Sequence, residues 1–313
     1  MNARKIKLKK YMFIVNPASS NGTTGKKWPE HKKQFEEALG EISYEMTNAP
    51  RHATKLVRTA LQEGYQIIVS VGGDGTMNEV LNGFLNDQGE QINPNAHLTV
   101  FSLGTGCDFI KTLEQKKGIE EVIAVLKREK EKIIDVGWLI ATETDKQKRY
   151  YLNIADSGLG GATTSRVNKK TKILKGFLSF FLASIHSLYI YKDKKAIVVL
   201  DGKTVATGLI NSVIVANGKY FGGGMKIAPD ALLDDGLLDV IVIHHMSKPL
   251  LFKSFLSIYK GNHINNPYCS FYKGRHVIIK AGENKMLTEL DGEQVGTIPA
   301  EFGILPCAIR IFV

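Results

Sequence analysis

The chain contains little cysteine and no apolar run long enough to cross a membrane. Its 313 residues include three cysteines, Cys107, Cys269 and Cys307, an odd number without C-x-x-C spacing. Neither a disulfide framework nor a zinc site is indicated, and a reducing compartment such as the cytoplasm is expected. The first residues are basic, as in a signal peptide, but the apolar segment 11–15 that follows is too short for one and predicts a first strand.

One segment of the second half, residues 171–192, has a helical and strongly apolar pattern. Lys175 and His186 interrupt it, so fewer than about 18 uninterrupted apolar residues remain and a membrane-spanning helix is not expected. Lysines at both ends of the segment would suit a helix lying on an anionic membrane surface. A helix buried in its own domain explains the same pattern, so contact of helix 173–191 with a membrane stays open.

Basic residues outnumber acidic ones. The 41 lysines and arginines exceed the 31 aspartates and glutamates, which gives a formal net charge of +10. This excess predicts an anionic partner or environment, such as a nucleotide, an acidic membrane surface or nucleic acid. No recognised nucleic-acid-binding motif supports the last of these, so nucleic acid is not expected as a partner. Apolar residues make up 43% of the chain, enough for two folded domains.

The pattern of residues changes near position 135. Before it, strands alternate with helices, which predicts a parallel sheet with helices on its faces, an α/β domain at 1–134. After it, short β-rich runs separated by Gly, Asp or Asn predict an antiparallel sandwich or barrel at 135–299. The last segment, 300–313, is again strand-like and is expected to join either sheet. The strands expected in the first domain are 11–15, 42–46, 66–71 and 98–103.

The stretch IIVSVGGDGTMNEVLNGF, residues 67–84, predicts a phosphate site. Its β-branched start indicates a buried parallel strand, and from Met77 onward apolar residues recur at helical spacing. The segment between them, Gly72–Thr76, is therefore expected to be a strand-to-helix loop. Glycines let such a loop approach a ligand closely, and the free N–H groups at the start of the helix favour an anion.

Asp74 narrows the chemistry of this loop. A Walker loop is absent, because NGTTGKKW lacks its first glycine, and no G-x-G-x-x-G follows the first strand. A bare carboxylate in a phosphate-binding turn would repel the phosphate unless a metal ion lay between them. Asp74 therefore predicts magnesium and a nucleotide, although a plain turn remains an alternative on these residues alone.

Four blocks of sequence resemble the soluble diacylglycerol kinase and sphingosine kinase family of lipid kinases. They are NPASSNGTTGK (16–26), GGDGTMNEVLNGF (72–84), LGTGCDF (103–109) and LDGE (290–293). GGDGT also occurs in NAD kinases and phosphofructokinases, but here Asn78 and Glu79 follow it and the other blocks stand in order along nearly the whole chain. The resemblance implies a parallel-sheet nucleotide-binding domain of the NAD kinase and phosphofructokinase type, joined to a β-rich sandwich domain that binds lipid.

The resemblance also implies which residues bind ATP. They would be Asn16, Pro17, Ala18, Ser19, Ser20, Thr47, Gly72, Gly73, Asp74, Gly75, Thr76, Met77, Asn78 and Thr105. Most follow a predicted strand at its carboxyl end, where open parallel sheets bind ligands. Turn or cap roles remain alternatives for Asn16, Pro17 and Thr47. The third block departs from the family pattern, with Ser102 where proline is common and Cys107 where asparagine is common, but Asp108 is retained.

Two acids near the end of the chain have two interpretations. KMLTELDGEQVGT is typical of a hairpin with Asp-Gly at its turn, in which an exposed acid has no chemical role. The resemblance instead implies that Glu293 is the general base that takes the proton from the lipid hydroxyl, with Asp291 nearby. Asp74 would be the magnesium-associated acid of the same catalytic site.

A second acidic stretch, PDALLDDGLLDV at 229–240, resembles a structural magnesium site of the same family. Its ligands would be the Asp235 carboxylate and the backbone oxygens of Leu232 and Leu237, since hard cations prefer oxygen ligands. A turn that leads into the following strand is an equal alternative.

Together these features predict an ATP- and magnesium-dependent kinase that phosphorylates a lipid hydroxyl, with diacylglycerol as substrate and phosphatidic acid as product. The basic charge predicts a peripheral enzyme that meets its substrate at an anionic membrane surface from the cytoplasm. A kinase for another lipid or for NAD, and a nucleotide- or lipid-binding regulator without turnover, remain alternatives. The sequence leaves acyl preference and oligomeric state open, a homodimer included.

Overall fold

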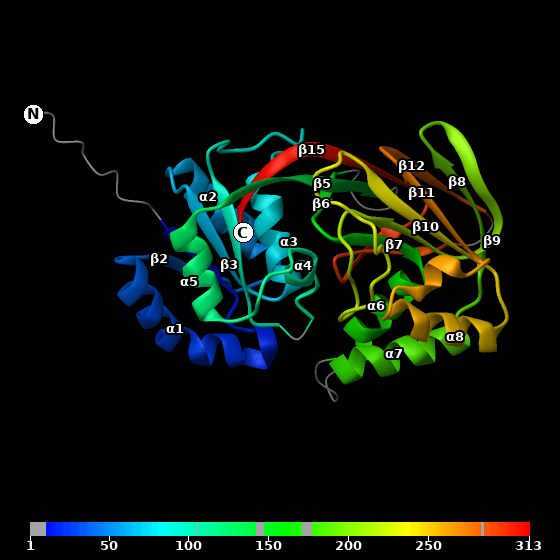
Figure 1. Ribbon diagram of the computed structural model, residues 1–313, viewed down its shortest axis with the longest axis horizontal. Helices are drawn as coiled ribbons and strands as arrows, with labels where there is room; N and C mark the ends of the chain where they lie inside the picture. Colours follow the sequence, from blue (N-terminus) through cyan, green and yellow to red (C-terminus); the bar gives the residue numbers. More distant parts are fainter. Residues whose placement is uncertain (1–10, 105, 142–146, 171–176, 283–284) are drawn as a thin grey trace, which may run out of the picture.

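The computed structural model describes residues 11–104, 106–141, 147–170, 177–282 and 285–313. They form two lobes joined by long strands, an α/β domain and a β-sandwich domain (Figure 1). The predicted fold class is therefore confirmed. All strands belong to one hydrogen-bonded network, which runs from the parallel part in the first domain to the antiparallel part in the second.

The first domain has three layers, with helices covering both faces of a parallel sheet (Figure 1). Its strands, in spatial order, are β2 (Ser43–Met46), β1 (Tyr11–Val15), β3 (Ile67–Gly72) and β4 (His97–Ser102). The helices are α1 (Thr23–Leu39), α2 (His52–Gln62), α3 (Asp74–Phe84), α4 (Asp108–Thr112) and α5 (Ile119–Arg128). The expected strands lie within one residue of these bounds.

Strand β1 shows why both faces of this sheet are covered. Its five residues are all buried, and alternate side chains enter different cores. Phe13 packs with Trp28 and Phe35 of α1, whereas Ile14 faces the core that α2 and α3 cover. A strand enclosed on both sides has no polar alternation, which is the pattern from which the parallel sheet was predicted.

The second domain is built from antiparallel strands. They are β6 (Arg149–Tyr151), β7 (Ile154–Gly158), β8 (Lys194–Leu200), β9 (Lys203–Ala216), β10 (Leu238–His244), β11 (Cys269–Gly274), β12 (His276–Ala281), β13 (Leu287–Leu290) and β14 (Glu293–Thr297). One apolar core fills the sandwich and a second lies under the helices α6 (Leu159–Lys170), α7 (Phe177–Ile190) and α8 (Lys248–Ile258). Val213 and Val215 of β9 point into the first core, and Ile214 points into the second.

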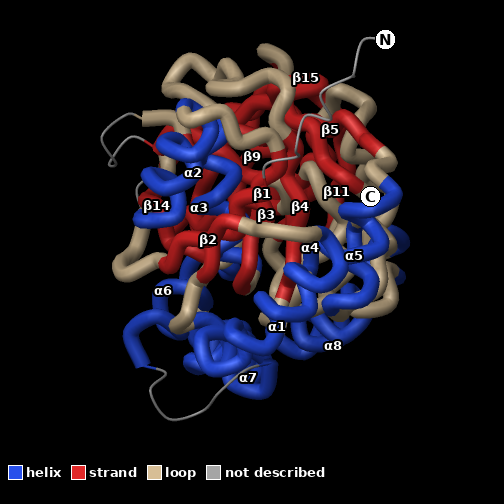
Figure 2. The backbone as a smooth tube through the Cα atoms, turned by 90° about the vertical axis from the view of Figure 1, so that its left-hand side faces the viewer, coloured by secondary structure: helices blue, strands red, loops and turns tan. Residues whose placement is uncertain are grey.

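Helices α6 and α7 lie together below the sheet when the molecule is turned (Figure 2). Of the apolar segment expected to be helical at 171–192, residues 171–176 lie outside the described part, and α7 occupies 177–190. In the described part of the chain, no helix is both long and apolar enough to span a bilayer.

Two long strands connect the domains. Strand β15 (Ala300–Phe312) pairs in parallel with β4 through Arg310 and Ile311, and antiparallel with β12 through its first residues. It also pairs along most of its length with β5 (Glu131–Ala141). The expected boundary near residue 135 thus falls inside a strand rather than in a linker, and the last segment joins both sheets.

A buried tyrosine ring of β6 packs closely on a glycine of the connecting strand β5. A Cβ at Gly137 would lie 2.3 Å from Cζ of Tyr151, whose side chain is fully buried. We predict that Gly137→Ala lowers the free energy of unfolding by about 1–3 kcal/mol, because the ring has no space into which to move. Urea denaturation measures the loss, and replacing Tyr151 with leucine in the same variant should recover part of it. Unchanged stability of Gly137→Ala would contradict the packing argument.

Candidate functional site

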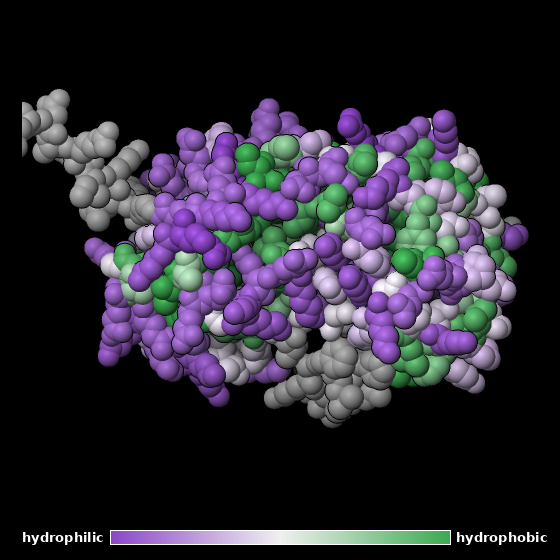
Figure 3. Space-filling view, viewed as in Figure 1, coloured by the Kyte–Doolittle hydropathy of each residue, from purple (hydrophilic) through white to green (hydrophobic). Residues whose placement is uncertain are grey.

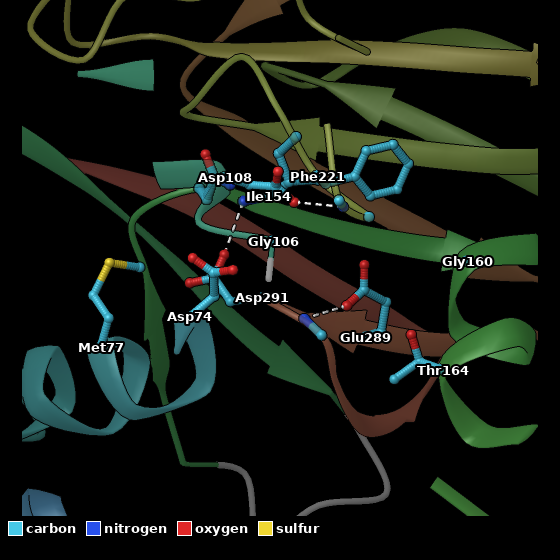
Figure 4. Close-up of a pocket in the computed structure, with 14 residues that line it drawn as sticks. Asp74, Met77, Gly106, Asp108, Ile154, Gly160, Thr164, Phe221, Glu289 and Asp291 are labelled. Carbon is cyan, nitrogen blue, oxygen red and sulfur yellow. Dashed lines mark hydrogen bonds between the residues drawn. The ribbon is translucent and has the colours of Figure 1, made fainter. Parts of the chain in front are cut away.

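A cavity of about 210 Å³ lies where the two domains meet (Figure 4). Its walls come from the start of α3, the β4–α4 loop, β7, the start of α6, the loop at 221–223 and the β13–β14 hairpin. Four acids line it: Asp74, Asp108, Glu289 and Asp291. Residues more than 200 positions apart in the chain thus share one cavity, between the carboxyl ends of the parallel strands and the second domain.

The predicted phosphate loop has the expected strand–loop–helix form, but α3 begins at Asp74, so the loop is shorter than predicted. Close contacts require glycine at positions 72 and 104. A Cβ at Gly72 would lie 2.4 Å from Thr76 Oγ1, and a Cβ at Gly104 would lie 3.1 Å from Gly73 Cα. The backbones of the β3–α3 and β4–α4 loops therefore touch, with the unpaired N–H end of α3 beside them.

The loop after β1 joins the same assembly. Asn16 Nδ2 donates a hydrogen bond to Thr76 Oγ1 at 2.9 Å, and Ser20 Oγ donates one to the Leu103 carbonyl. Ser19 Oγ donates to the Asn16 carbonyl at 3.0 Å. Gly25 approaches Pro17 so closely that a Cβ would lie 2.9 Å from the proline Cβ.

The remaining residues predicted to bind ATP divide into two groups. Thr47 follows β2 and donates its backbone N–H to the Val15 carbonyl at 2.8 Å, which places it at the same end of the sheet as Asn16. Gly75, Met77 and Asn78 lie in the first turns of α3. Thr105 lies outside the described residues, so its position stays a prediction.

Asp74 and Asp108 flank Gly106. A Cβ at that glycine would lie 2.9 Å from Asp74 Oδ2 and 3.7 Å from Asp108 Oδ2. Burial, reinforced by the charge of Asp108, raises the pKa of Asp74 to about 6, although N–H groups of Asp108 and Cys107 oppose the shift. Asp108 is paired with Lys111 Nζ at 2.9 Å and accepts the Gly223 N–H at 2.7 Å. Asp74 has no such ammonium partner among the described residues.

The two departures from the family pattern contact each other. Ser102 Oγ donates to Cys107 Sγ at 2.8 Å, and the thiol donates to the Gly104 carbonyl at 2.8 Å. Cys107 is buried and adopts a positive φ of 51° at the N-cap of α4. The thiol therefore closes the β4–α4 turn from inside, and Asp108 begins the helix directly after it.

Asp291 lies in a hairpin turn, as one interpretation of the sequence predicted, but its side chain is not exposed, and its part in catalysis stays a prediction. Asp291 and Gly292 form the β13–β14 turn with φ values of 45° and 89°. The carboxylate nevertheless points inward and accepts the N–H of Ile154 at 3.0 Å, that of Leu152 at 3.3 Å and Asn78 Nδ2 at 3.0 Å. Burial raises its pKa to about 6, although these three donors favour the ionised form.

Glu293 lies against the first turn of α3 but is not one of the residues that line the cavity. Its Oε1 is 3.7 Å from the position that a Cβ on Gly75 would take. Its Oε2 is 3.2 Å from Arg149 Nη2, and 40% of its side chain is exposed. The predicted base thus lies beside the residue that follows Asp74, although nearly 220 residues separate the two acids in the chain, and its role stays a prediction.

Two further acids of this region were not predicted from the sequence. Asp156 of β7 and Glu289 of β13 are buried cross-strand neighbours. Glu289 and Asp291 are two positions apart in TELDGE, and side chains two positions apart in a strand point to the same side of the sheet. This spacing could have indicated that Glu289 faces the same way as Asp291. No local pattern marks Asp156. The loop 221–224, to which no role was assigned, reaches the cavity through Phe221 and the Gly223 N–H.

Two family models match the chain. Residues 10–139 match the diacylglycerol kinase catalytic domain, and residues 153–313 match the YegS C-terminal NAD kinase beta sandwich-like domain. The chain belongs to the diacylglycerol kinase family of lipid kinases. It is 29% identical over 300 residues to a diacylglycerol kinase of Bacillus subtilis, covering 94% of this chain and 93% of the relative. It is 27% identical over 304 residues to one of Staphylococcus carnosus, covering 97% and 95%.

Solved structures support the fold of this lipid kinase. A crystal structure of a diacylglycerol kinase from Bacillus anthracis matches with a TM-score of 0.76 at 23% identity, covering 98% of both chains. An NAD kinase from Archaeoglobus fulgidus, in complex with ATP, matches with a TM-score of 0.51 at 16% identity, covering 97% of this chain and 93% of that one.

Asp74 and Asp108 fit a divalent cation better than Asp235 does. The first two are neighbouring carboxylates whose repulsion contributes to the raised pKa of Asp74, beside the N–H groups of a phosphate loop. In the described part of the kinase, no three acid, histidine or cysteine side chains could hold a metal together. A cation here would therefore need water or phosphate oxygens to complete its ligands.

The predicted structural magnesium site already contains a cation from the chain. Lys273 Nζ lies 3.1 Å from Asp235 Oδ2, 3.3 Å from Asp239 Oδ2 and 3.4 Å from the Asp230 carbonyl. Asp235 Oδ1 accepts the Leu237 N–H at 3.1 Å, as in the predicted turn. A metal bound by Asp235, Leu232 and Leu237 stays a prediction, and the ammonium of Lys273 would compete with it.

Because burial raises the pKa of Asp74, its ionised form opposes folding. The folded kinase binds more protons at this group than the unfolded chain does, so this contribution to stability falls as pH rises from about 4 to about 6. We predict that Asp74→Asn raises the free energy of unfolding at pH 7.5, without magnesium or nucleotide, by on the order of 1–3 kcal/mol. The gain should shrink as pH falls toward 4. Denaturation across this range measures it, the exposed Glu63→Gln is the control, and a pH-independent difference would contradict it.

Proposed function

We propose that this lipid kinase transfers the γ-phosphoryl group of ATP to the free hydroxyl of diacylglycerol and yields phosphatidic acid. The observation that carries the proposal is that three acids from the two domains lie around the start of α3. Asp74 begins α3, Glu293 Oε1 borders the first turn of that helix, and Asp291 is hydrogen-bonded to Asn78 within it. Phosphoryl transfer requires alignment and charge neutralisation, and acids gathered at this helix start are suited to both.

The three touching loops after β1, β3 and β4 support binding of the ATP phosphates. The N–H groups at the start of α3 face the cavity, and the helix dipole favours an anion there. The hydrogen bond between Asn16 and Thr76 holds two of the loops together, so the proposed phosphate site is already formed without ATP. Thr47, at the same end of the sheet, and the predicted contact from Thr105 complete the proposed nucleotide site.

Asp74 and Asp108 would hold magnesium against the phosphates. When bound there, the ion supplies charge neutralisation for the transferred group. Asp108 is already shared with Lys111 and the Gly223 N–H, which leaves Asp74 as the acid that most lacks a positive partner. Lys111 can in addition interact with a phosphate oxygen, since it lies beside the cavity acid Asp108.

Glu293 is proposed as the general base. The lipid hydroxyl oxygen bonds to the γ-phosphorus, the bond from that phosphorus to the bridging oxygen breaks with its electrons leaving on ADP, and the hydroxyl proton passes to the carboxylate. Arg149 fixes one oxygen of Glu293 and leaves Oε1 directed toward Gly75. Asp291 positions the hairpin rather than taking the proton, because three donors already occupy its carboxylate.

The second domain supplies surfaces suited to a lipid. A smaller cavity of about 50 Å³, lined mainly by apolar side chains, adjoins the first and shares Gly160 and Phe221 with it. Large apolar side chains are also exposed on α7 and α8, among them Tyr189, Phe252 and Leu256. The face in Figure 3 is largely hydrophilic over the first domain and more mixed over the second. We propose that the α7–α8 end meets an anionic membrane, to which the net charge of +10 attracts the kinase.

Removing the proposed base should affect the chemical step. We predict that Glu293→Gln lowers kcat for diacylglycerol by about 10²–10⁴-fold, because amide nitrogen and oxygen cannot accept the proton. Glu301→Gln, an acid of the same domain that pairs with His276 away from the cavity, is the matched control and should retain activity. Labelled ATP and a total lipid extract provide the assay. Wild-type kcat in Glu293→Gln would remove it as base, and label on NAD but on no lipid would overturn the substrate class.

The net positive charge should help the kinase to bind membranes that contain its lipid and should leave the phosphoryl-transfer step itself unchanged. We predict faster phosphorylation of long-chain diacylglycerol in anionic vesicles than in neutral ones, with an advantage that disappears as salt screens the charges. A dissolved short-chain diacylglycerol is the control, because its phosphorylation needs no membrane. Equal rates in both kinds of vesicle at low salt would contradict peripheral binding through charge.

A further inference from the structure

Two buried acids near the cavity have no role in the proposed phosphoryl transfer. Asp156 of β7 and Glu289 of β13 are paired residues of adjacent antiparallel strands, so their side chains lie on the same face. Only 2% of Asp156 and 4% of Glu289 are exposed. They come from segments more than 130 residues apart, and the fold brings them together directly behind the cavity.

The hydrogen bonds of this carboxyl pair are incomplete. Asp156 Oδ2 accepts the Gly160 N–H at 2.9 Å, and Glu289 Oε2 accepts the Gly292 N–H at 2.8 Å. Asp156 Oδ1 is buried and has no hydrogen-bond partner among the described residues, although the nearby Ser212 hydroxyl favours the ionised carboxyl. No lysine or arginine in the described part of the chain forms an ion pair with either acid. A buried polar atom without a partner is costly, and such atoms require an explanation.

Burial keeps protons on the pair. It raises the pKa of Asp156 to about 7 and that of Glu289 well above its ordinary value, and the charge of Asp156 adds to the shift of Glu289. Two buried acids that lie side by side, with no cation paired to them among the described residues, are costly to ionise together, so the pair favours a form that retains a proton. A neutral carboxyl group donates one hydrogen bond, which an ionised one cannot. Ketosteroid isomerase uses a protonated acid in this way, as a donor in an apolar site.

The pair stands between the two cavities. Glu289 lines the larger one together with Asp74 and Asp291, and Asp156 lines the smaller apolar one. The first turn of α6 is pressed against both strands. A Cβ at Gly160 would lie 1.9 Å from Asp156 Oδ2, and one at Gly161 would lie 2.2 Å from the Leu287 carbonyl. These two glycines thus let the first turn of α6 pack directly against Asp156 and β13, where the two cavities adjoin.

A ligand that occupies both adjoining cavities would be apolar at one end and carry a neutral hydrogen-bond acceptor a few atoms from its reacting hydroxyl. We propose that Glu289, the cross-strand neighbour of Asp156, donates a hydrogen bond to an ester carbonyl oxygen of the glycerolipid substrate, with the adjoining acyl carbons in the smaller cavity. This inference rests on the proposed function and deepens it, because it makes the ester, and not only the hydroxyl and the tails, a recognised group. The carboxyl pair would be a specificity site and takes no part in the transfer step.

The test compares two lipids that differ only at the ester. 1,2-Dioctanoylglycerol and its ether analogue 1,2-dioctylglycerol carry the same hydroxyl, but the ether lacks the carbonyl oxygens. We expect wild-type kcat/KM to favour the diacyl lipid by roughly three- to tenfold, the effect of one neutral hydrogen bond. Glu289→Met should lower this ratio to about one, mainly through KM. Glu289→Gln keeps a donor and should retain the preference. Glu301→Gln is again the control.

Each outcome decides the inference. Equal use of the two lipids by the wild-type kinase would overturn the ester site and leave the proposed lipid kinase activity standing. A preference that survives in Glu289→Met would also overturn it, provided that the variant still shows the wild-type thermal shift with ATP. Because the wild-type comparison needs no substitution, misfolding of a variant does not remove the test. Product from neither lipid would remove the proposed substrate together with the ester site.

Discussion

The site depends on the hydrogen bonds that gather on one carboxylate of the second domain. Asp291 accepts the backbone N–H groups of Leu152, just before β7, and of Ile154, its first residue, together with the side-chain amide of Asn78 from α3. Asn78 also donates to the Tyr150 carbonyl at 2.9 Å, and Asn82, one turn later, bonds the same residue. The helix that begins with Asp74 is thus fixed to the hairpin that carries Glu293. Charge-assisted bonds of this kind are stronger than neutral ones, so they can set the geometry between domains.

This arrangement has a cost in stability. The carboxyl groups of Asp74, Asp156 and Asp291 all have raised pKa values because burial disfavours their charge, and none of the three forms an ion pair with a described residue. Asp235 and Asp239 differ in having a counterion, since Lys273 lies between them, although burial still raises the pKa of Asp239. Acids that a fold leaves without a counterion concentrate at sites where a ligand, a metal ion or a proton supplies the missing charge. Here they line the cavity between the domains and the smaller cavity that adjoins it in the second domain.

The parts of the site that follow from local pattern could be predicted from the sequence. The run from Ile67 to Phe84 has a strand period, a glycine turn and a helix period in succession, and each is decided by neighbours in the chain. The hairpin at Asp291 was equally readable, but its pattern could not show that the turn acid points inward. That depends on the amides of Leu152 and Ile154, which the sheet pairing of β7 with β13 supplies. Non-local pairing has no signature in a single sequence.

The same reason explains why the carboxyl pair escaped sequence analysis. Asp156 precedes a serine and a glycine and looks like a residue of a turn, whereas it lies inside a five-residue strand that is buried throughout. Its carboxylate accepts the N–H of Gly160, four residues later, but the acid beside it, Glu289, comes from β13. An unpaired acid in the middle of a buried strand conflicts with the local rule that such strands are apolar. Conflicts of this kind are expected where function outweighs stability, and this one occurs next to the reacting groups rather than elsewhere in the sandwich.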